Sequence, residues 1–129
     1  ERDPMDNCFS LFKMLFSSKK QHSYSFDLEI LGKYYLVYKN MIDSWRKIYK
    51  DNIFTCKYED LISKPEVEIG KILKYCGINW ENDVLKFYET KRTVKTASHS
   101  QVRQKLYKSS IRSWENYKDD LGSLSKLIT

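Results

Sequence analysis

Apolar residues recur at steps of three and four along most of the chain, which is the spacing of one face of an α-helix. The first such stretch begins at Pro4 behind a capping Asp3 and predicts a helix that ends near Ser17 and Ser18. Asp27 caps a second, more regular stretch that holds for about 20 residues. Its stripe consists of Leu28, Leu31, Tyr35, Tyr38, Ile42, Trp45 and Tyr49. Helices are therefore predicted to dominate.

The second half of the chain adds shorter elements. Ser63 and Glu66 have the spacing of a capping box that opens a helix, and Gly77 is placed to end that helix in a left-handed conformation. Asn79 can cap a short helix after it. A last helix is predicted from the stripe Ile111, Trp114, Tyr117, Leu121, Leu124 and Ile128.

One short stretch has the composition of a β-strand. Residues 53–58 are apolar and rich in residues that favour strands. A lone strand leaves its backbone groups unpaired, so its partner strands are expected upstream of Glu1. The predicted fold class is mainly α with one short strand.

Composition narrows the class of protein. The chain has 129 residues, 41% hydrophobic and 31% charged, which is typical of one globular domain without a membrane span. Cys8, Cys56 and Cys76 show no CxxC spacing and lie in apolar surroundings, so we interpret them as small buried side chains in a reducing compartment, with a disulfide between two of them left open. With only two histidines, no metal site is predicted. Abundant lysine and asparagine suit a bacterial cytoplasmic protein.

Positive charge is concentrated in one segment. Residues 91–112 contain seven Lys and Arg and no acid, whereas the rest of the chain has sixteen basic residues against seventeen acidic ones. Hydroxyl side chains lie among or beside these cations, at Thr90, Thr93, Thr96, Ser98, Ser100 and Tyr107. Hydroxyls and guanidinium groups together suit a phosphate or sulfate ligand, although a solvated basic loop is the plainer alternative.

A second anion site is predicted where the first helix begins. Arg2 precedes the helix, and Ser10 lies in its second turn. The N-terminus of a helix presents unpaired N–H groups and a positive partial charge, which favour a phosphate. An ordinary capped helix start is the alternative.

Four motifs occur in order: Arg2-Asp3-Pro4 with Ser10, then Tyr58-Glu59-Asp60-Leu61, then Thr96-Ala97-Ser98 with Gln101-Val102-Arg103, and then Trp114. Together they resemble the carboxy-terminal half of a sulfotransferase, particularly the bacterial enzymes often fused to helical repeats and the tyrosylprotein sulfotransferases. The resemblance covers nearly all of residues 1–129. It implies a partial sulfotransferase domain, the carboxy-terminal portion of an α/β P-loop-type fold.

The resemblance also implies site residues. Arg2 and Ser10 match the pair that binds the 3′-phosphate of 3′-phosphoadenosine 5′-phosphosulfate, the sulfuryl donor. Tyr58 matches a tyrosine that contacts the adenine. Ser98 matches a catalytic serine beside the transferring sulfuryl group, which it also helps to bind. The loop that closes over the nucleotide matches Gln101, Val102 and Arg103.

The chain departs from the family pattern at two places. Met14 stands where the tyrosylprotein enzymes have a second arginine. Ser113, rather than a basic residue, directly precedes the tryptophan, so Arg112 is expected to bind the donor from one position earlier. The family's 5′-phosphosulfate loop and general base lie upstream of Arg2, so these residues alone are predicted to be inactive.

The predicted function is therefore part of a sulfotransferase that transfers the sulfuryl group to a hydroxyl or amine acceptor. Two alternatives come from the residues themselves. The basic segment could form a single-stranded nucleic-acid-binding module, although the aromatics lie mostly on the helical stripes rather than in that segment. The long helix after Asp27 could instead form a helical interaction module, with a homodimer as one outcome.

Overall fold

The computed structural model describes residues 1–14, 16, 22–90 and 101–128, and the chain divides into two compact units. The first, here called the terminal unit, comprises Arg2–Ile53 and Ser109–Thr129. The second, the central unit, comprises Glu1 and Phe54–Lys108. Each unit is described by itself below.

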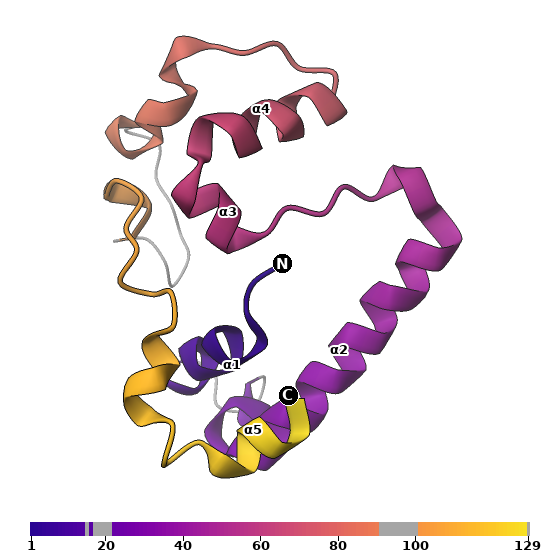
Figure 1. The fold of residues 1–129 in the computed structure, drawn as a ribbon, viewed down its shortest axis with the longest axis vertical. Coiled ribbons are helices and arrows are strands. Elements are labelled where there is room, and N and C mark those ends of the chain that lie inside the picture. Colours follow the sequence, from indigo (N-terminus) through magenta and orange to yellow (C-terminus); the bar gives the residue numbers. More distant parts are fainter. Residues whose placement is uncertain (15, 17–21, 91–100, 129) are drawn as a thin grey trace. The chain divides into compact units, whose positions relative to one another are not determined.

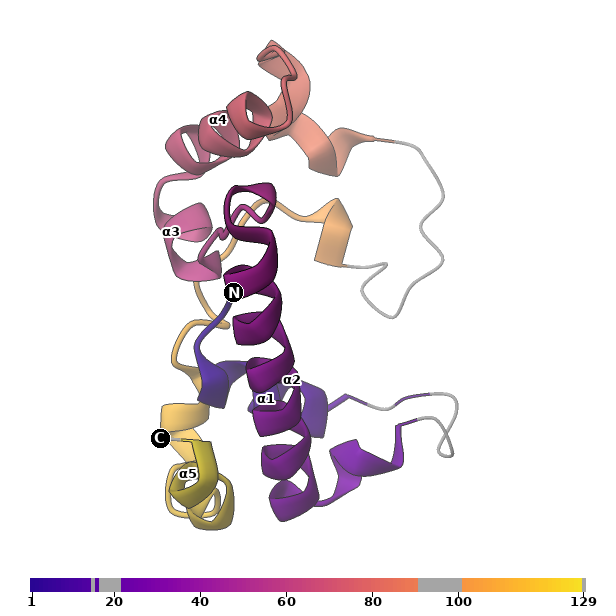
Figure 2. The same cartoon turned by 90° about the vertical axis from the view of Figure 1, so that its right-hand side faces the viewer.

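The terminal unit is built around its longest helix. Helix α2 (Leu28–Tyr49) contacts both α1 (Pro4–Phe12) and α5 (Gly122–Ile128), so the two ends of the chain meet on one helix (Figures 1 and 2). Three 3₁₀-helices complete the unit: η1 (Ser23–Phe26), η2 (Lys50–Asn52) and η5 (Ser113–Tyr117). The buried core consists of Met5, Cys8, Phe9, Leu31, Leu121, Leu124 and Ile128.

Helix α1 begins where the sequence predicts. The Asp3 carboxylate accepts a hydrogen bond from the Asp6 N–H at 2.9 Å, and Pro4 occupies the first helical position, where no N–H is needed. The predicted end is wrong, because the helix stops at Phe12. The Met14 N–H turns back to the Leu11 carbonyl at 3.1 Å, and this three-residue step tightens the chain out of the α-helix.

Helix α2 confirms the predicted cap and length. The Asp27 carboxylate accepts from the N–H groups of Glu29 and Ile30, and the helix runs for 22 residues. Its apolar stripe is used unevenly: Leu31 is fully buried, whereas Trp45 is 45% exposed. Of the helices in the described ranges, none is both long and apolar enough to cross a membrane.

The central unit contains α3 (Tyr58–Ser63), α4 (Pro65–Tyr75), η3 (Asn82–Glu89) and η4 (Gln101–Arg103). The predicted capping box is wrong, because Ser63 ends α3 and its hydroxyl donates to the Asp60 carbonyl. The stop at Gly77 is confirmed. Its φ is +67°, and the Ile78 N–H reaches back to the Leu73 carbonyl at 2.9 Å, as in a Schellman motif.

The predicted strand at residues 53–58 is also wrong, and no strand occurs among the residues that the structure describes. Helix α3 already begins at Tyr58, and extended backbone is found at Ile53 and Lys57 before it. Glu1 makes one step of parallel pairing here: its N–H group donates to the Cys56 carbonyl, and its own carbonyl accepts from the Tyr58 N–H at 2.7 Å. A single step does not make a strand, because a ladder needs successive pairs.

Two predicted helices take different forms. The element expected after Asn79 begins at Asn82 and is the 3₁₀-helix η3. The last stripe does not form one helix but is divided into η5 and α5, with a turn between them. Leu121 and Leu124 are buried on either side of Gly122, whereas Tyr117 is 50% exposed. The division lets the apolar residues of α5 pack on α2.

The three cysteines differ in exposure, so the prediction that all are buried holds only for Cys8. Cys56 is half-buried and Cys76 is exposed, and all three are free thiols. Burial raises the pKa of Cys8 to about 12, with a smaller contribution from the Asp3 carboxylate.

Thiol labelling tests this burial. At pH 8 we expect iodoacetamide to modify Cys76 rapidly and Cys8 only after unfolding, because the thiolate is the reactive form and Cys8 keeps its proton. Peptide mass spectrometry with and without urea measures both sites. Equal labelling of the two thiols in the native chain would contradict the buried position of α1.

Glycine-to-alanine substitutions test the contact between α2 and α5. A Cβ at Gly32 would lie 2.9 Å from Leu127 Cδ1 and 3.3 Å from its Cβ, whereas a Cβ at Gly122 would meet nothing within 4 Å. We expect Gly32→Ala to lower the free energy of unfolding by about 1 kcal/mol, because crowding outweighs the gain in helix propensity. Gly122→Ala is the control and should leave the free energy of unfolding unchanged or raise it. Urea denaturation measures both, and a stabilised Gly32→Ala would refute the close approach.

Candidate functional site

Arg2 joins the start of the chain to the end of the basic segment. It lies directly before α1 and is half-buried. Its Nη2 donates to the main-chain carbonyl of Ser110 at 2.7 Å. Arg2, of the second predicted anion site, thus contacts the end of the basic segment within the terminal unit, 108 positions later in the chain.

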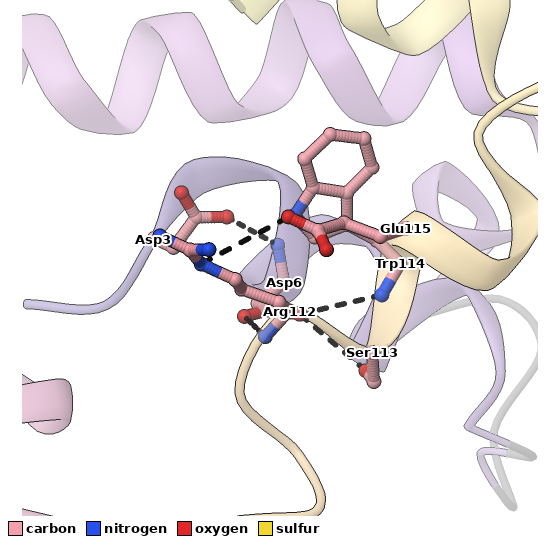
Figure 3. Close-up of polar contacts among 6 residues, drawn as sticks. All are labelled: Asp3, Asp6, Arg112, Ser113, Trp114 and Glu115. Atoms are coloured by element: carbon pink, nitrogen blue, oxygen red, sulfur yellow. Dashed lines mark hydrogen bonds and ion pairs between the residues drawn. The ribbon is translucent and has the colours of Figure 1, made fainter.

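Asp6 makes the second connection between these segments. It lies in the first turn of α1, and its side chain is fully buried. Its Oδ2 accepts from the Arg112 N–H at 2.5 Å, and its Oδ1 receives longer contacts of 3.4 Å from the Ser113 hydroxyl and the Trp114 N–H (Figure 3). A buried carboxylate is costly unless it is hydrogen-bonded, so these donors are what allow the charge to stay inside.

The turn that Asp6 holds is strained. Arg112 has φ +56° and ψ +24°, a left-handed conformation that costs a non-glycine residue about 1 kcal/mol or more. Arg112 is also the N-cap of η5, but its own side chain makes no capping hydrogen bond. Asp6 therefore caps η5 from a different helix. We call residues 112–114 the clamped turn.

The side chain of Arg112, unlike its main-chain N–H, is in contact with solvent. It is 76% exposed, and its Nε lies 3.8 Å from Oε1 of Glu115. An exposed pair at this distance holds the guanidinium weakly. The main chain of Arg112 is fixed, while its charge is available to a ligand.

Ser10 lies on the same side of α1 as Asp6. The two residues are four positions apart, so their side chains are neighbours along one face of the helix. Ser10 is half-buried. The terminal unit thus holds three of the predicted donor-binding residues: Arg2, Ser10 and Arg112.

The N-terminus of α1 is less open than the sequence suggests. Of the N–H groups expected to receive an anion, Pro4 has none, and that of Asp6 is bonded to the Asp3 carboxylate. Part of the helix end is therefore satisfied by the chain itself. Any anion near α1 has to be held mainly by side chains such as Arg2 and Ser10.

The other predicted site residues belong to the central unit. Tyr58 opens α3, is half-buried, and donates its N–H to the carbonyl of Glu1, the residue before Arg2. Gln101, Val102 and Arg103 form η4, in which Val102 and Arg103 are half-buried. Ser98 lies outside the described residues. Within the described ranges, no three His, Cys, Asp or Glu side chains gather as a metal site would require.

Asp6 is the buried polar residue of this region that the sequence interpretation misses. An acidic residue in the first turn of a helix is expected merely to favour the helix dipole. Its neighbours offer a weak signal, because Met5, Cys8 and Phe9 are buried and a charge among them needs a partner. Periodicity could not show that the partner is a turn 106 positions later.

Comparison with known proteins gives one family. A model of the sulfotransferase family matches residues 1–82. An uncharacterized protein from Aquifex aeolicus (strain VF5) is 32% identical over 129 residues, which is 99% of this chain and 17% of that protein. The chain thus spans about a sixth of the length of this relative. No solved structure matches.

The strain at Arg112 can be tested by substitution. Arg112→Gly should keep or raise the free energy of unfolding, by up to about 1 kcal/mol, because glycine adopts a positive φ without a steric cost. Lys118→Gly is the matched control: it also removes an exposed cation, but from a right-handed backbone, and should lower stability by about 0.5–1 kcal/mol. Urea denaturation compares the two. Equal destabilisation would contradict the left-handed turn.

Proposed function

Because the chain belongs to the sulfotransferase family, we propose that it binds the 3′-phosphate and adenine of 3′-phosphoadenosine 5′-phosphosulfate in a sulfuryl-transfer enzyme. The acceptor is a hydroxyl or an amine. Since the chain covers 17% of the Aquifex relative, the activity of a whole protein is part of this proposal.

The contact between Arg2 and Ser110 carries the proposal. Arg2 is the residue that the family motif assigns to the 3′-phosphate, and in the structure its guanidinium reaches the segment that supplies the chain's positive excess. A guanidinium is planar and presents its donors as a fork that matches the oxygens of a phosphate, so an arginine at this place supports the proposal. Ser10 and Arg112, in the same unit, could add a hydroxyl and a second cation.

The central unit is assigned the rest of the nucleotide. We propose that the ring of Tyr58 contacts adenine and that η4, with Gln101, Val102 and Arg103, closes over the donor. Ser98 is assigned to the transferring sulfuryl group. Tyr58 is the first residue of α3, and its N–H donates to the Glu1 carbonyl. This bond supports a fixed position for the main chain of Tyr58.

The chemistry suits such a site. Sulfuryl transfer, like phosphoryl transfer, depends mainly on positioning the reactants and on stabilising negative charge. The basic residues supply the positive charge that stabilises it, and no metal is assigned a role. The acceptor needs a general base, and we assign none of the described residues to it.

Neither alternative is favoured by the comparisons. A nucleic-acid-binding module would use the same cations, but the match to the sulfotransferase family covers the Arg2 and Ser10 motif as well as α3 and α4. A helical interaction module would use α2, and the same match includes that helix within an enzyme domain.

Nucleotide binding tests the proposed function. Isothermal titration with adenosine 3′,5′-bisphosphate should show binding that Arg2→Ala weakens about 10- to 100-fold, because a charge-assisted hydrogen bond contributes about 1.5–3 kcal/mol. Ser10→Ala, which removes a single hydroxyl, should weaken it about fivefold. Adenosine 5′-monophosphate should bind the variants and the unsubstituted chain alike, since it lacks the 3′-phosphate.

Lys39→Ala is the control for net charge. Lys39 is an exposed cation on α2 in the same unit, so its loss changes the total charge as Arg2→Ala does. It should leave both affinities within about twofold at moderate salt, because exposed charges are screened beyond about 10 Å. Equal weakening by Lys39→Ala and Arg2→Ala would mean that the chain attracts anions only through its overall charge, and the proposal would fail.

A further inference from the structure

The buried carboxylate of Asp6 has no part in the proposed donor contacts, yet it touches the turn that carries one of them. Its side chain is fully buried in the first turn of α1. The shortest of its contacts is to the main-chain N–H of Arg112. A carboxylate that accepts only from main-chain and hydroxyl donors acts on the path of the backbone rather than on a charged partner.

We propose that Asp6 is a positioning residue of the donor site, which fixes the clamped turn so that Arg2 and Arg112 can hold the 3′-phosphate together. This inference rests on the proposed function. Asp6 itself does not contact the nucleotide. It acts through the turn.

The geometry gives the reason. Arg112 needs a left-handed backbone, which exposed chain adopts rarely, and no side chain of the turn caps η5. Asp6 supplies that cap from α1. Two residues before the turn, Ser110 offers its carbonyl to Arg2. When the turn is held, Arg112 has a fixed main chain, and Arg2 has a fixed hydrogen-bond partner in the Ser110 carbonyl.

The charge of Asp6 could instead oppose an anion. A carboxylate near two arginines lowers the local positive potential, unless its charge is already compensated. Here it faces the N–H dipoles of the clamped turn, away from solvent. The two readings predict opposite signs: removal of the charge weakens 3′-phosphate binding if Asp6 positions the turn and strengthens it if Asp6 repels the ligand.

The contact between Asp6 and the clamped turn, here called the anchor, can first be tested by amide hydrogen exchange without nucleotide. In the unsubstituted chain the amide hydrogens of Arg112 and Trp114 should exchange slowly. In Asp6→Asn at least one of them should exchange about tenfold faster, because the two N–H groups bond to different carboxylate oxygens and an amide side chain retains only one acceptor oxygen. The control is Asp27→Asn, which makes the same change at the cap of α2, where both N–H donors share one side-chain oxygen that asparagine keeps. It should leave exchange at Glu29, Ile30, Arg112 and Trp114 unchanged. Unaltered exchange at both Arg112 and Trp114 in Asp6→Asn would refute the anchor.

The second measurement is the ratio of two affinities. For Asp6→Asn we expect the Kd of adenosine 3′,5′-bisphosphate to rise about tenfold and that of adenosine 5′-monophosphate to change less than twofold. Asp27→Asn should leave both unchanged. A purely structural role would weaken both nucleotides alike, so an equal loss overturns the inference, as does tighter binding of the bisphosphate.

The two proposals fail differently. If the unsubstituted chain does not prefer the bisphosphate to the monophosphate, the proposed function is wrong. If it does and Asp6→Asn keeps the same preference, only the role of Asp6 is wrong. Should Asp6→Asn not fold, Ser113→Ala removes one donor and leaves the carboxylate in place. It should lower the preference for the bisphosphate about twofold, and an unchanged preference would overturn the inference.

Discussion

The terminal unit depends on satisfying one buried negative charge. Asp6 lies among the apolar residues of α1, where an unpartnered carboxylate would be strongly unfavourable. Its donors come from a turn more than 100 positions away, so the charge forces two distant segments together. The same contact stabilises the left-handed backbone of Arg112, whose own side chain makes no capping hydrogen bond. The same hydrogen bonds of Asp6 therefore allow α1 to be buried and hold the turn in its shape.

Local signals were sufficient where local chemistry decides the structure. The Asp3 and Asp27 caps, the length of α2 and the left-handed stop at Gly77 follow from short-range hydrogen bonds and from glycine's freedom, and the structure has all of them. The strand at residues 53–58 depends on partners instead. Composition marks the segment as extended and apolar, but only a neighbouring chain can make it a strand, and Glu1 supplies a single step of pairing.

The candidate site divides in the same way. Arg2 and Ser10 could be singled out because a cation and a hydroxyl near a helix start have a recognisable chemistry, and Arg112 because it lies in the basic segment shortly before Trp114. Their relation to each other could not, because it runs through the Ser110 carbonyl and the Asp6 carboxylate, and neither has a sequence signature. The last helical stripe shows the same limit. Its spacing is regular, yet the cap on η5 and the packing of α5 on α2 divide it.

An anion site beside two carboxylates is electrostatically consistent only if both are already engaged. Asp3 accepts from the Asp6 N–H, and Asp6 from the clamped turn, so each carboxylate is bonded to the positive end of an N–H dipole. Of the two guanidinium groups, that of Arg2 donates to a neutral carbonyl, and that of Arg112 is exposed and lies 3.8 Å from Glu115. Negative charge is thus used to shape the main chain, and positive charge is left on the side chains. That separation is consistent with the proposal that acidic residues shape a site for an acidic ligand.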